Sequence, residues 1–433
     1  MKKIFIFLYL ITHSAIAQTN IQKIDSLLSY YNREDKIMGQ FAIKLGNSTV
    51  YQKTLGSNHP DIKVNNETRY RIGSITKMFT ATMIMQLVEE KKLKLTDKLS
   101  KFYPKIDQAN NITIEMLLRH RSGINDYINS DQALDANNLA LTKQDVINTI
   151  NTYKSIFEPD SKTQYSNSNY FLLGQILEQI TQKNYSENLI ARICKPLNLY
   201  YTTLSNNPID INKKEINSYT VKNSTWEVIP QTNTKIPDAA GGIISTANDL
   251  TTFIHALFSY KLVKKETLEV MMQTKNGFGL GLTVIPFGDR KFYGHVGRID
   301  GFETSVAYYP NEKLSYAALY NGVNTNTNEV NIAILSIYYH QPYTFPDLTD
   351  LEINESILNK YVGIYKSDAL PIKIKIFVQN SKLYAQAAGQ SSFPLSAKSE
   401  TVFTFDPAKI KMTFKNNEFT LNQSNTEYVF IKD

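Results

Sequence analysis

The sequence has little cysteine: one residue, Cys194, among 433. A single thiol excludes an internal disulfide and any metal site built from several cysteines. We therefore expect Cys194 to pack as a small hydrophobic residue. The 6 histidines form no H-x-x-E-H, H-E-x-x-H or H-x-H pattern, which argues against a metallohydrolase.

Concentrated positive charge is also absent. The formal net charge is +7, yet no five consecutive residues carry charge of one sign, and dense segments such as Glu89-Glu90-Lys91-Lys92 mix both signs. Because nucleic-acid binding requires a concentrated basic stripe, this charge is interpreted as a solvated surface, and no nucleic-acid partner is expected.

A hydrophobic run long enough to span a membrane is missing at the N-terminus. Residues 4–11 form an apolar segment of eight residues between Lys2-Lys3 and the small-x-small sequence Ala15-Ile16-Ala17. This is the pattern of a secretory signal peptide, and eight residues are too few to span a bilayer. Residues 1–17 are therefore predicted to be a signal peptide. The mature chain is expected to be exported, periplasmic or secreted, with no integral membrane segment.

The hydrophobic periodicity of residues 18–342 predicts an α+β domain. A helix at 21–32 is followed by strands at 39–45 and 50–54, and a long helix begins at Ser74 and runs to about Lys92. Further helices are predicted at 114–118, 143–152, 169–182 and 247–259, and strands at 279–285, 290–295, 304–309 and 314–321. Strands at both ends and helices between them indicate an antiparallel sheet assembled from the two ends of the domain.

A domain boundary is predicted near residues 342–351, where two prolines and several acidic residues follow a helical stretch at 329–338. Short alternating runs follow, at 372–378, 382–387, 401–405, 410–414, 418–423 and 427–431. Residues 352–433 are therefore expected to form a small all-β domain.

The first candidate catalytic group is Ser74-Ile75-Thr76-Lys77 at the start of the long helix. Residues three apart share a helix face, so the Lys77 amine can reach the Ser74 hydroxyl and activate it as a nucleophile. Two or three such S-x-x-K matches are expected by chance, but the chain contains one. The alternative is that Ser74 only caps the helix and Lys77 is solvated.

The second candidate is Tyr165-Ser166-Asn167. A tyrosine beside a lysine can move a proton between nucleophile and leaving group, and an asparagine amide can orient both lysine and substrate. The pattern also occurs at Tyr30 and Tyr127, so an ordinary packed tyrosine is the alternative.

The third candidate is His295-Val296-Gly297 at the end of a predicted strand. A glycine there allows a substrate to lie close to the strand, and the N–H after it can point into an oxyanion hole. Taken alone, His295 could equally be a buried structural histidine.

In order and spacing the three groups together resemble the serine β-lactamase and penicillin-binding protein superfamily. They are most similar to the branch of class C β-lactamases, D-alanyl-D-alanine carboxypeptidases, D-amino-acid peptidases and esterases. The flanking segments 70–73, 117–124 and 240–250 are also similar to that branch, and the resemblance covers residues 25–340. The tail, opening with Tyr361-Val362-Gly363-Ile364-Tyr365, resembles the lipocalin-like domain of some members.

The resemblance implies a β-lactamase/transpeptidase-like fold in which Ser74 is the acylated nucleophile and Lys77 activates it. Tyr165 would act as general base and then as acid, and Asn167 would orient Lys77 and the substrate. The backbone N–H groups of Ser74 and Arg298 would form the oxyanion hole. No metal and no cofactor is implied.

The sequence departs from the family at His295, where many relatives carry the lysine of a K-T-G motif. Histidine supplies a weaker, pH-dependent positive charge, which favours a peptidase, amidase or esterase over an efficient β-lactamase. Arg298 could restore an anchor for a substrate carboxylate through its planar guanidinium, or it could be a surface residue.

The expected function is therefore that of an exported serine hydrolase that cleaves D-amino-acid peptides or related amides, in the manner of a D-alanyl-D-alanine carboxypeptidase. The alternatives are a carboxylic-ester hydrolase, a weak β-lactamase, or a non-catalytic binding or structural protein on the same scaffold. The expected partner is a small-molecule or peptide substrate, and the sequence carries no signal for an oligomeric state.

Overall fold

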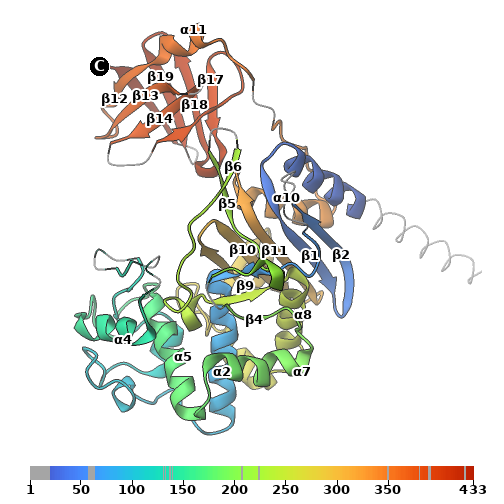
Figure 1. Ribbon diagram of the computed structural model, residues 1–433, viewed down its shortest axis with the longest axis vertical. Coiled ribbons are helices and arrows are strands. Elements are labelled where there is room, and N and C mark those ends of the chain that lie inside the picture. Colours follow the sequence, from blue (N-terminus) through green and yellow to red (C-terminus); the bar gives the residue numbers. More distant parts are fainter. Residues whose placement is uncertain are drawn as a thin grey trace, which may run out of the picture. The chain divides into compact units, whose positions relative to one another are not determined.

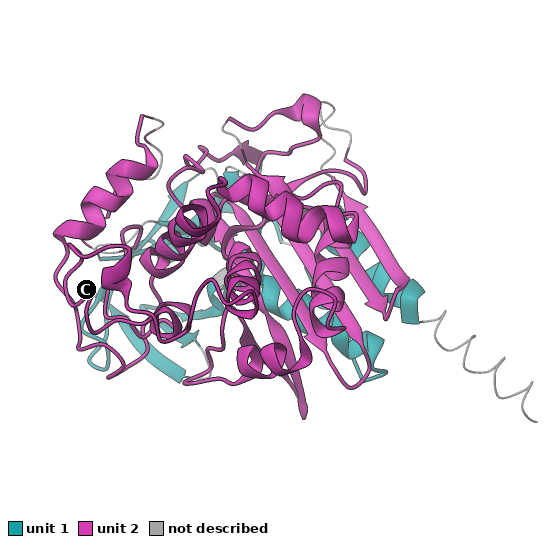
Figure 2. Cartoon of the chain, turned by 90° about the horizontal axis from the view of Figure 1, so that it is seen from below, with its two compact units in different colours: residues 1–37, 221–225, 323–433 teal, residues 38–220, 226–322 magenta. Residues whose placement is uncertain are grey.

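The computed structural model describes residues 20–433 except 57–63, 130, 132, 136–137, 139, 206–207, 223–224, 349–350, 380, 389–391 and 424–425 (Figure 1). The predicted signal peptide, residues 1–17, lies outside the described residues. Within the described chain, no helix is both long and apolar enough to cross a membrane. The chain forms two compact units, residues 38–220 with 226–322, and residues 1–37 with 221–225 and 323–433 (Figure 2).

The larger unit is built on an antiparallel sheet whose central path runs β2-β1-β11-β10-β9-β8. Its strands are β1 (Ile37–Leu45), β2 (Ser48–Leu55), β8 (Thr283–Phe287), β9 (Arg290–Ile299), β10 (Phe302–Tyr309) and β11 (Leu314–Val323). β5 (Tyr219–Lys222) joins β11 in parallel and pairs with β6 (Thr225–Val228). The first and last strands of the domain are thus neighbours, which confirms the predicted sheet from both ends.

Helices pack with this sheet, and two of them hold candidate site residues predicted from the sequence, Lys77 in α2 and Asn167 in α5. The short 3₁₀ turn η1 (Gly73–Ile75) leads directly into α2 (Thr76–Glu89), and α5 (Asn167–Thr181) and α8 (Ala247–Phe258) pack into the same core. The other helices are α3 (Ile114–Leu118), α4 (Lys143–Thr152), α6 (Tyr185–Leu189), α7 (Lys195–Leu197) and α9 (Lys265–Met272). Buried Phe79 of α2 and Phe253 of α8 stack with ring centroids 3.8 Å apart.

Local sequence signals explain most helix ends. Thr246 begins α8 because its side chain accepts a hydrogen bond from the Asp249 N–H at 3.1 Å. The strand predicted from 279 begins only at Thr283, because Gly279 N donates to Leu282 O at 2.8 Å and closes a turn. Cys194 is buried in the larger unit, as expected.

A small sheet that the sequence did not predict holds the segment before Ser74. Its order is β3 (Tyr70–Arg71), β7 (Ile243–Ser245) and β4 (Thr203–Leu204). β3 pairs antiparallel with β7, and Ile72 N continues the pairing by donating to Ile243 O at 3.0 Å. Strands of two or three residues are too short to show hydrophobic periodicity, so only their pairing reveals them.

The smaller unit contains the predicted all-β tail. Its sheet has the order β15-β14-β13-β12-β20-β19-β18-β17-β16. Its strands are β12 (Gly363–Lys366), β13 (Lys373–Gln379), β14 (Lys382–Ala387), β15 (Phe393–Pro394), β16 (Ser396–Ala397), β17 (Val402–Phe405), β18 (Ile410–Lys415), β19 (Glu418–Gln423) and β20 (Thr426–Lys432). The unit also contains a helix at 20–33, α10 (Thr327–Tyr338) and α11 (Glu355–Leu358).

The sheet of the tail curls towards closure around an aromatic core. Its two end strands, β15 and β16, are separated in the chain only by Leu395. The two edges of the sheet therefore lie close together, as in a sheet that closes into a barrel. The interior is filled by Tyr361, Phe414, Phe419 and other buried side chains, and Phe419 stacks on Phe430 at 5.0 Å. This near-barrel confirms the all-β expectation for the tail.

The stacked pair Phe79–Phe253 provides a test of this core. We expect Phe79→Ala to lower the free energy of unfolding by about 3–5 kcal/mol, because it leaves a cavity at a site with no solvent exposure. The matched control is Tyr200→Ala, since the Tyr200 side chain is 79% exposed, and its effect should stay within about 0.5 kcal/mol. Denaturant unfolding measures both. Equal effects of the two variants would contradict this assignment of the core.

Candidate active site

Ser74 lies in a turn that brings bare backbone against strand β9. Gly73 has φ +51°, and a Cβ on it would lie 2.8 Å from Arg298 N and from Arg298 O. Gly297 is equally constrained, because a Cβ there would lie 2.1 Å from Ile72 O and 3.0 Å from Ser74 N. Only glycines allow this approach. The close packing therefore holds η1 beside the end of β9.

Three of the residues predicted from the sequence meet at the Ser74 hydroxyl. Lys77 Nζ lies 3.1 Å from Ser74 Oγ, and the Tyr165 hydroxyl donates to the same oxygen at 2.7 Å. Ser74 lies in η1 and Lys77 in the first turn of α2, whereas Tyr165 precedes α5. The serine oxygen is thus placed between an amine and a phenol, the arrangement that activates a serine nucleophile.

Lys77 is buried completely and its amine is held by three acceptors. Besides the serine, Nζ donates to Asn167 Oδ1 at 2.8 Å and to Ala240 O at 2.6 Å. Burial lowers the pKa of Lys77 to about 7, and the negative charge of Asp126 opposes that shift. A lysine with this pKa exists in both protonation states near neutrality, as a proton acceptor for a serine requires.

Asn167 connects Lys77 to a carboxylate that the sequence analysis missed. Its Nδ2 donates to both oxygens of Asp126, at 2.9 and 3.3 Å. Asp126 is itself fixed by the backbone N–H groups of Ile128 and Asn129. The amide orientation of Asn167 is therefore fixed, with its oxygen towards Lys77, because its nitrogen faces an acceptor.

Tyr165 packs against a second residue whose role the sequence analysis missed. The His120 ring stacks on the Tyr165 ring at 4.4 Å. His120 Nδ1 accepts a hydrogen bond from Ser166 N at 3.2 Å, and burial, Lys77 and His295 lower its pKa well below the usual value. His120 is thus a neutral platform. Burial also raises the pKa of Tyr165, which keeps the phenol protonated.

His295 lies within the same cluster but carries no charge at neutral pH. It is buried, its ring centroid lies 6.5 Å from that of Tyr165, and Nδ1 lies 2.5 Å from Val296 O. Burial and the charge of Lys77 lower its pKa to about 4. The weak positive charge expected from a histidine at this place is therefore lost near neutrality.

The backbone of Arg298 belongs to the site, whereas its side chain points to the solvent. Its backbone lies against Gly73, as described, but its guanidinium is 79% exposed and pairs with Glu303 of β10 at 3.0 Å. An exposed pair of this kind contributes at most about 1 kcal/mol. The role of the Arg298 side chain as a carboxylate anchor stays a prediction.

A buried ion pair ties the two backbone segments of the site together. Arg71 Nη1 donates to Asp300 Oδ2 at 2.9 Å, and both side chains are almost fully buried. Arg71 also donates to Thr232 O, and Thr232 N donates to Asp300 Oδ1. Arg71 precedes η1 and Asp300 follows β9, so the pair fixes the distance between the two.

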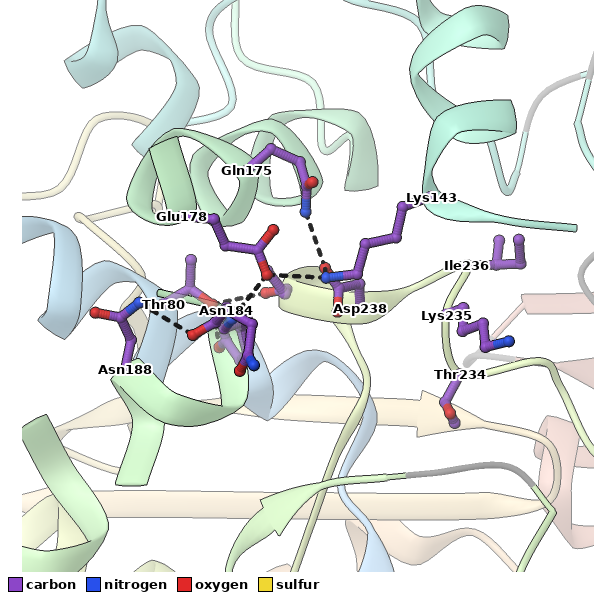
Figure 3. Close-up of polar contacts among 12 residues, drawn as sticks. Thr80, Lys143, Gln175, Glu178, Asn184, Asn188, Thr234, Lys235, Ile236 and Asp238 are labelled. Atoms are coloured by element: carbon purple, nitrogen blue, oxygen red, sulfur yellow. Dashed lines mark hydrogen bonds and ion pairs between the residues drawn. The ribbon is translucent and has the colours of Figure 1, made fainter. Parts of the chain in front are cut away.

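A second polar cluster holds the loop that supplies the Ala240 carbonyl. Figure 3 shows Lys143, Gln175 and Glu178 gathered around Asp238. Lys143 Nζ lies 2.9 Å from Asp238 Oδ2, and Gln175 donates to the same oxygen at 3.1 Å. Burial raises the pKa of Asp238 to about 6 although the Lys143 charge opposes the shift. Two residues later, Ala240 O accepts from Lys77.

The residues predicted as a site therefore come together: Ser74, Lys77, Tyr165, Asn167 and His295 form one cluster, beside Gly297 and the backbone of Arg298. Among the described residues no group of three or more histidine, cysteine, aspartate or glutamate side chains could hold a metal ion. Asp126 and His120 could not be assigned from the sequence, because Asp126 acts through its hydrogen bond with Asn167 and His120 through its stacking on Tyr165. Both contacts join segments that lie far apart in the chain.

Comparison with known proteins finds one matching family and several relatives of this chain. Residues 32–338 match the beta-lactamase family. The flp protein of Staphylococcus aureus is 27% identical over 318 residues, which are 69% of this chain. This chain covers only 63% of the length of flp. Penicillin-binding protein 4* of Bacillus subtilis is 26% identical over 385 residues, 82% of this chain and 83% of that protein.

Solved structures show the same fold. A D-stereospecific amidohydrolase from Streptomyces is 27% identical, with a TM-score of 0.63 over 74% of this chain and 97% of its own. An octameric penicillin-binding protein homologue from Pyrococcus abyssi has a TM-score of 0.66 over 95% of this chain and 100% of its own, at 24% identity.

The contact between Gly297 and η1 can be tested by adding one methyl group. In Gly297→Ala the new Cβ would collide with Ile72 O and separate β9 from η1. We expect labelling of Ser74 by a fluorophosphonate to slow about 100-fold or more, the usual cost of losing one oxyanion-hole donor. Intact-mass spectrometry measures the rate.

The matched control for this test is Val296→Ala, since the Val296 side chain is 58% exposed and its removal should leave labelling unchanged. An unchanged rate in Gly297→Ala would show that the reactivity of Ser74 does not depend on this close packing.

Proposed function

The chain belongs to the beta-lactamase family, and we propose that it is a serine hydrolase that works through an acyl-enzyme at Ser74. One observation carries the proposal. Ser74 Oγ lies within hydrogen-bond distance of both a buried lysine amine, at 3.1 Å, and a half-buried phenol, at 2.7 Å. A serine that only capped a helix would need neither group.

The acylation step follows from the two pKa values. Neutral Lys77 accepts the proton of Ser74 while Oγ attacks the carbonyl carbon of the substrate. The resemblance gave the role of general base to Tyr165, but burial raises the pKa of this phenol, so a phenolate is disfavoured at neutral pH. We therefore assign the base to Lys77. Tyr165, which lies next to Oγ, donates its proton to the leaving group as it takes up the proton that Lys77 removed from Ser74, so that no phenolate is left.

Backbone N–H groups supply the stabilisation of the oxyanion. The first N–H groups of a helix have no partner within the helix, and Ser74 stands second in η1. The Arg298 backbone lies directly against η1. We propose that the N–H groups of Ser74 and Arg298 bind the tetrahedral oxyanion. Water then attacks the ester carbon, neutral Lys77 accepts the proton of this water, and Ser74 Oγ leaves and takes up that proton as the acyl group is released.

The proposed substrates are amides or peptides of D-amino acids. Two relatives support this class: one is named a penicillin-binding protein and another a D-stereospecific amidohydrolase. A neutral His295 in place of a charged lysine provides no fixed charge for the carboxylate of a β-lactam, so efficient β-lactamase activity is disfavoured. Export is proposed from the predicted signal peptide.

The decisive experiment compares substrates on the purified protein and on Ser74→Ala. We expect D-alanine amide to be hydrolysed faster than L-alanine amide, with p-nitrophenyl acetate and benzylpenicillin as the ester and β-lactam references. Ser74→Ala should lower kcat by about 10⁴-fold or more, as expected for loss of a nucleophile. Intact mass identifies the acyl adduct on Ser74.

Each other result selects a different function. Turnover of the ester alone would identify an esterase, and fast turnover of penicillin would identify a β-lactamase. If a protein with a normal unfolding transition shows no turnover and no adduct, the result would support a non-catalytic binding or structural protein.

The pH dependence separates Lys77 from the other groups. Because the neutral amine is the reactive form, kcat/KM should fall about tenfold per pH unit below pH 7 and level off above it. His295, with a pKa of about 4, cannot produce this change. His295→Asn should therefore keep the midpoint near pH 7 even where it alters the rate. A midpoint that moved with His295 would contradict the assignment of Lys77.

A further inference from the structure

A polar cavity of about 230 Å³ lies in the larger unit, and none of its lining residues belongs to the serine site. Its walls are the turn between β1 and β2, the end of α7, one face of α8 and the loop after α8. Thr252, His255 and Ala256 lie three and four residues apart and so face the cavity together from α8.

The most unusual lining residue is Lys44, whose side chain is 8% exposed. Its Nζ donates to the Thr252 hydroxyl at 2.6 Å, while an ammonium group has three N–H donors. Burial lowers the pKa of Lys44, and the charge of Asp249 opposes this shift. Asp249 Oδ2, however, already accepts hydrogen bonds from Tyr201 N and the Thr202 hydroxyl. A buried cation with one hydroxyl partner is costly.

Further positive charge surrounds the cavity. The charged groups that lower the pKa of His255, after burial, are Lys261, Lys313 and Lys44. Gly46 N donates to Lys313 O at 2.9 Å, which brings the turn before β11 beside the cavity wall. Collecting like charges lowers stability, and an anion bound among them would offset this repulsion.

Two backbone carbonyls near the cavity are already hydrogen-bonded within the chain. The end of α7 also lines the cavity, and helix C-termini attract cations. The Cys194 and Lys195 carbonyls there are already used, since they accept from Leu199 N at 2.9 Å and Asn198 N at 3.3 Å. The pairing of β1 with β2 is also irregular between Ile43 and Lys44. Such irregularities re-aim side chains and are common at functional sites.

We propose that this cavity is a binding site for a phosphate group, held by Lys44 and Lys261 with the Asn47 and Asn198 amides. The Thr252 hydroxyl donates to Asn248 O at 2.8 Å and accepts from Lys44, so it positions the Lys44 amine. Ammonium groups bind phosphate as point charges, and the neutral donors add direction. The volume exceeds the roughly 30 Å³ share of one water several-fold, which leaves room for phosphate with a small substituent. The proposal does not depend on hydrolysis at Ser74.

The test uses inorganic phosphate as the probe and isothermal titration calorimetry at pH 7 and constant ionic strength. We expect saturable binding to the full chain and to Ser74→Ala, loss of saturable binding in Lys44→Met, and about tenfold to hundredfold weaker binding in Lys261→Ala. Lys261 is exposed, so its variant should fold normally. Lys105→Ala, at another exposed lysine, is the matched control and should bind like the unchanged protein.

A second arm identifies the source of the phosphate. Phosphatidylcholine vesicles with and without phosphatidic acid are sedimented with the same variants. Retention by phosphatidic acid that disappears in Lys44→Met would support a lipid phosphate, and saturable binding of inorganic phosphate alone would support a soluble one. Absence of saturable binding in both arms, or equal binding by Lys44→Met, Lys261→Ala and Lys105→Ala, would overturn the proposal.

Discussion

The active site depends on burying one lysine amine without an adjacent carboxylate. Lys77 is excluded from water, and a buried ammonium is stable only where hydrogen bonds replace its hydration. Ser74, Asn167 and Ala240 provide these hydrogen bonds from three separate segments. Asp126 is the nearest source of compensating charge, but it acts through Asn167. This indirect contact leaves the pKa of Lys77 near 7, whereas a direct ion pair would raise it.

Each partner of Lys77 needs support of its own, and buried ion pairs provide much of it. Lys143 and Asp238 fix the loop that ends at Ala240, while Arg71 and Asp300 fix β3 relative to the end of β9. Buried pairs contribute little net stability but are costly to break. Their value lies in geometry, because they prevent the loops from relaxing towards contacts that would satisfy Lys77 without a reactive serine.

The sequence predicts elements and residues whose signals are local. The bounds of α3 and α4 follow directly from apolar spacing. The three candidate catalytic groups were identified through the family resemblance that their order and spacing show together. The pairing of β3 with β7, the link from Asn167 to Asp126 and the stacking of His120 on Tyr165 depend on contacts between distant segments. Periodicity carries no information on such contacts. For the same reason the sequence suggested a partial charge on His295, whereas its burial beside Lys77 removes that charge.

The larger unit thus contains two buried lysines, and the contrast between them is informative. Lys77 has three acceptors, and one of them, Asn167, is itself hydrogen-bonded to the Asp126 carboxylate. Lys44 is nearly as buried, but it has a hydroxyl partner and lies among other cations. Burial lowers the pKa of both amines, that of Lys77 to about 7. Since the chain supplies fewer partners for Lys44 than for Lys77, the proposed phosphate in the adjoining cavity would add to the compensation that Lys44 receives from the charge of Asp249.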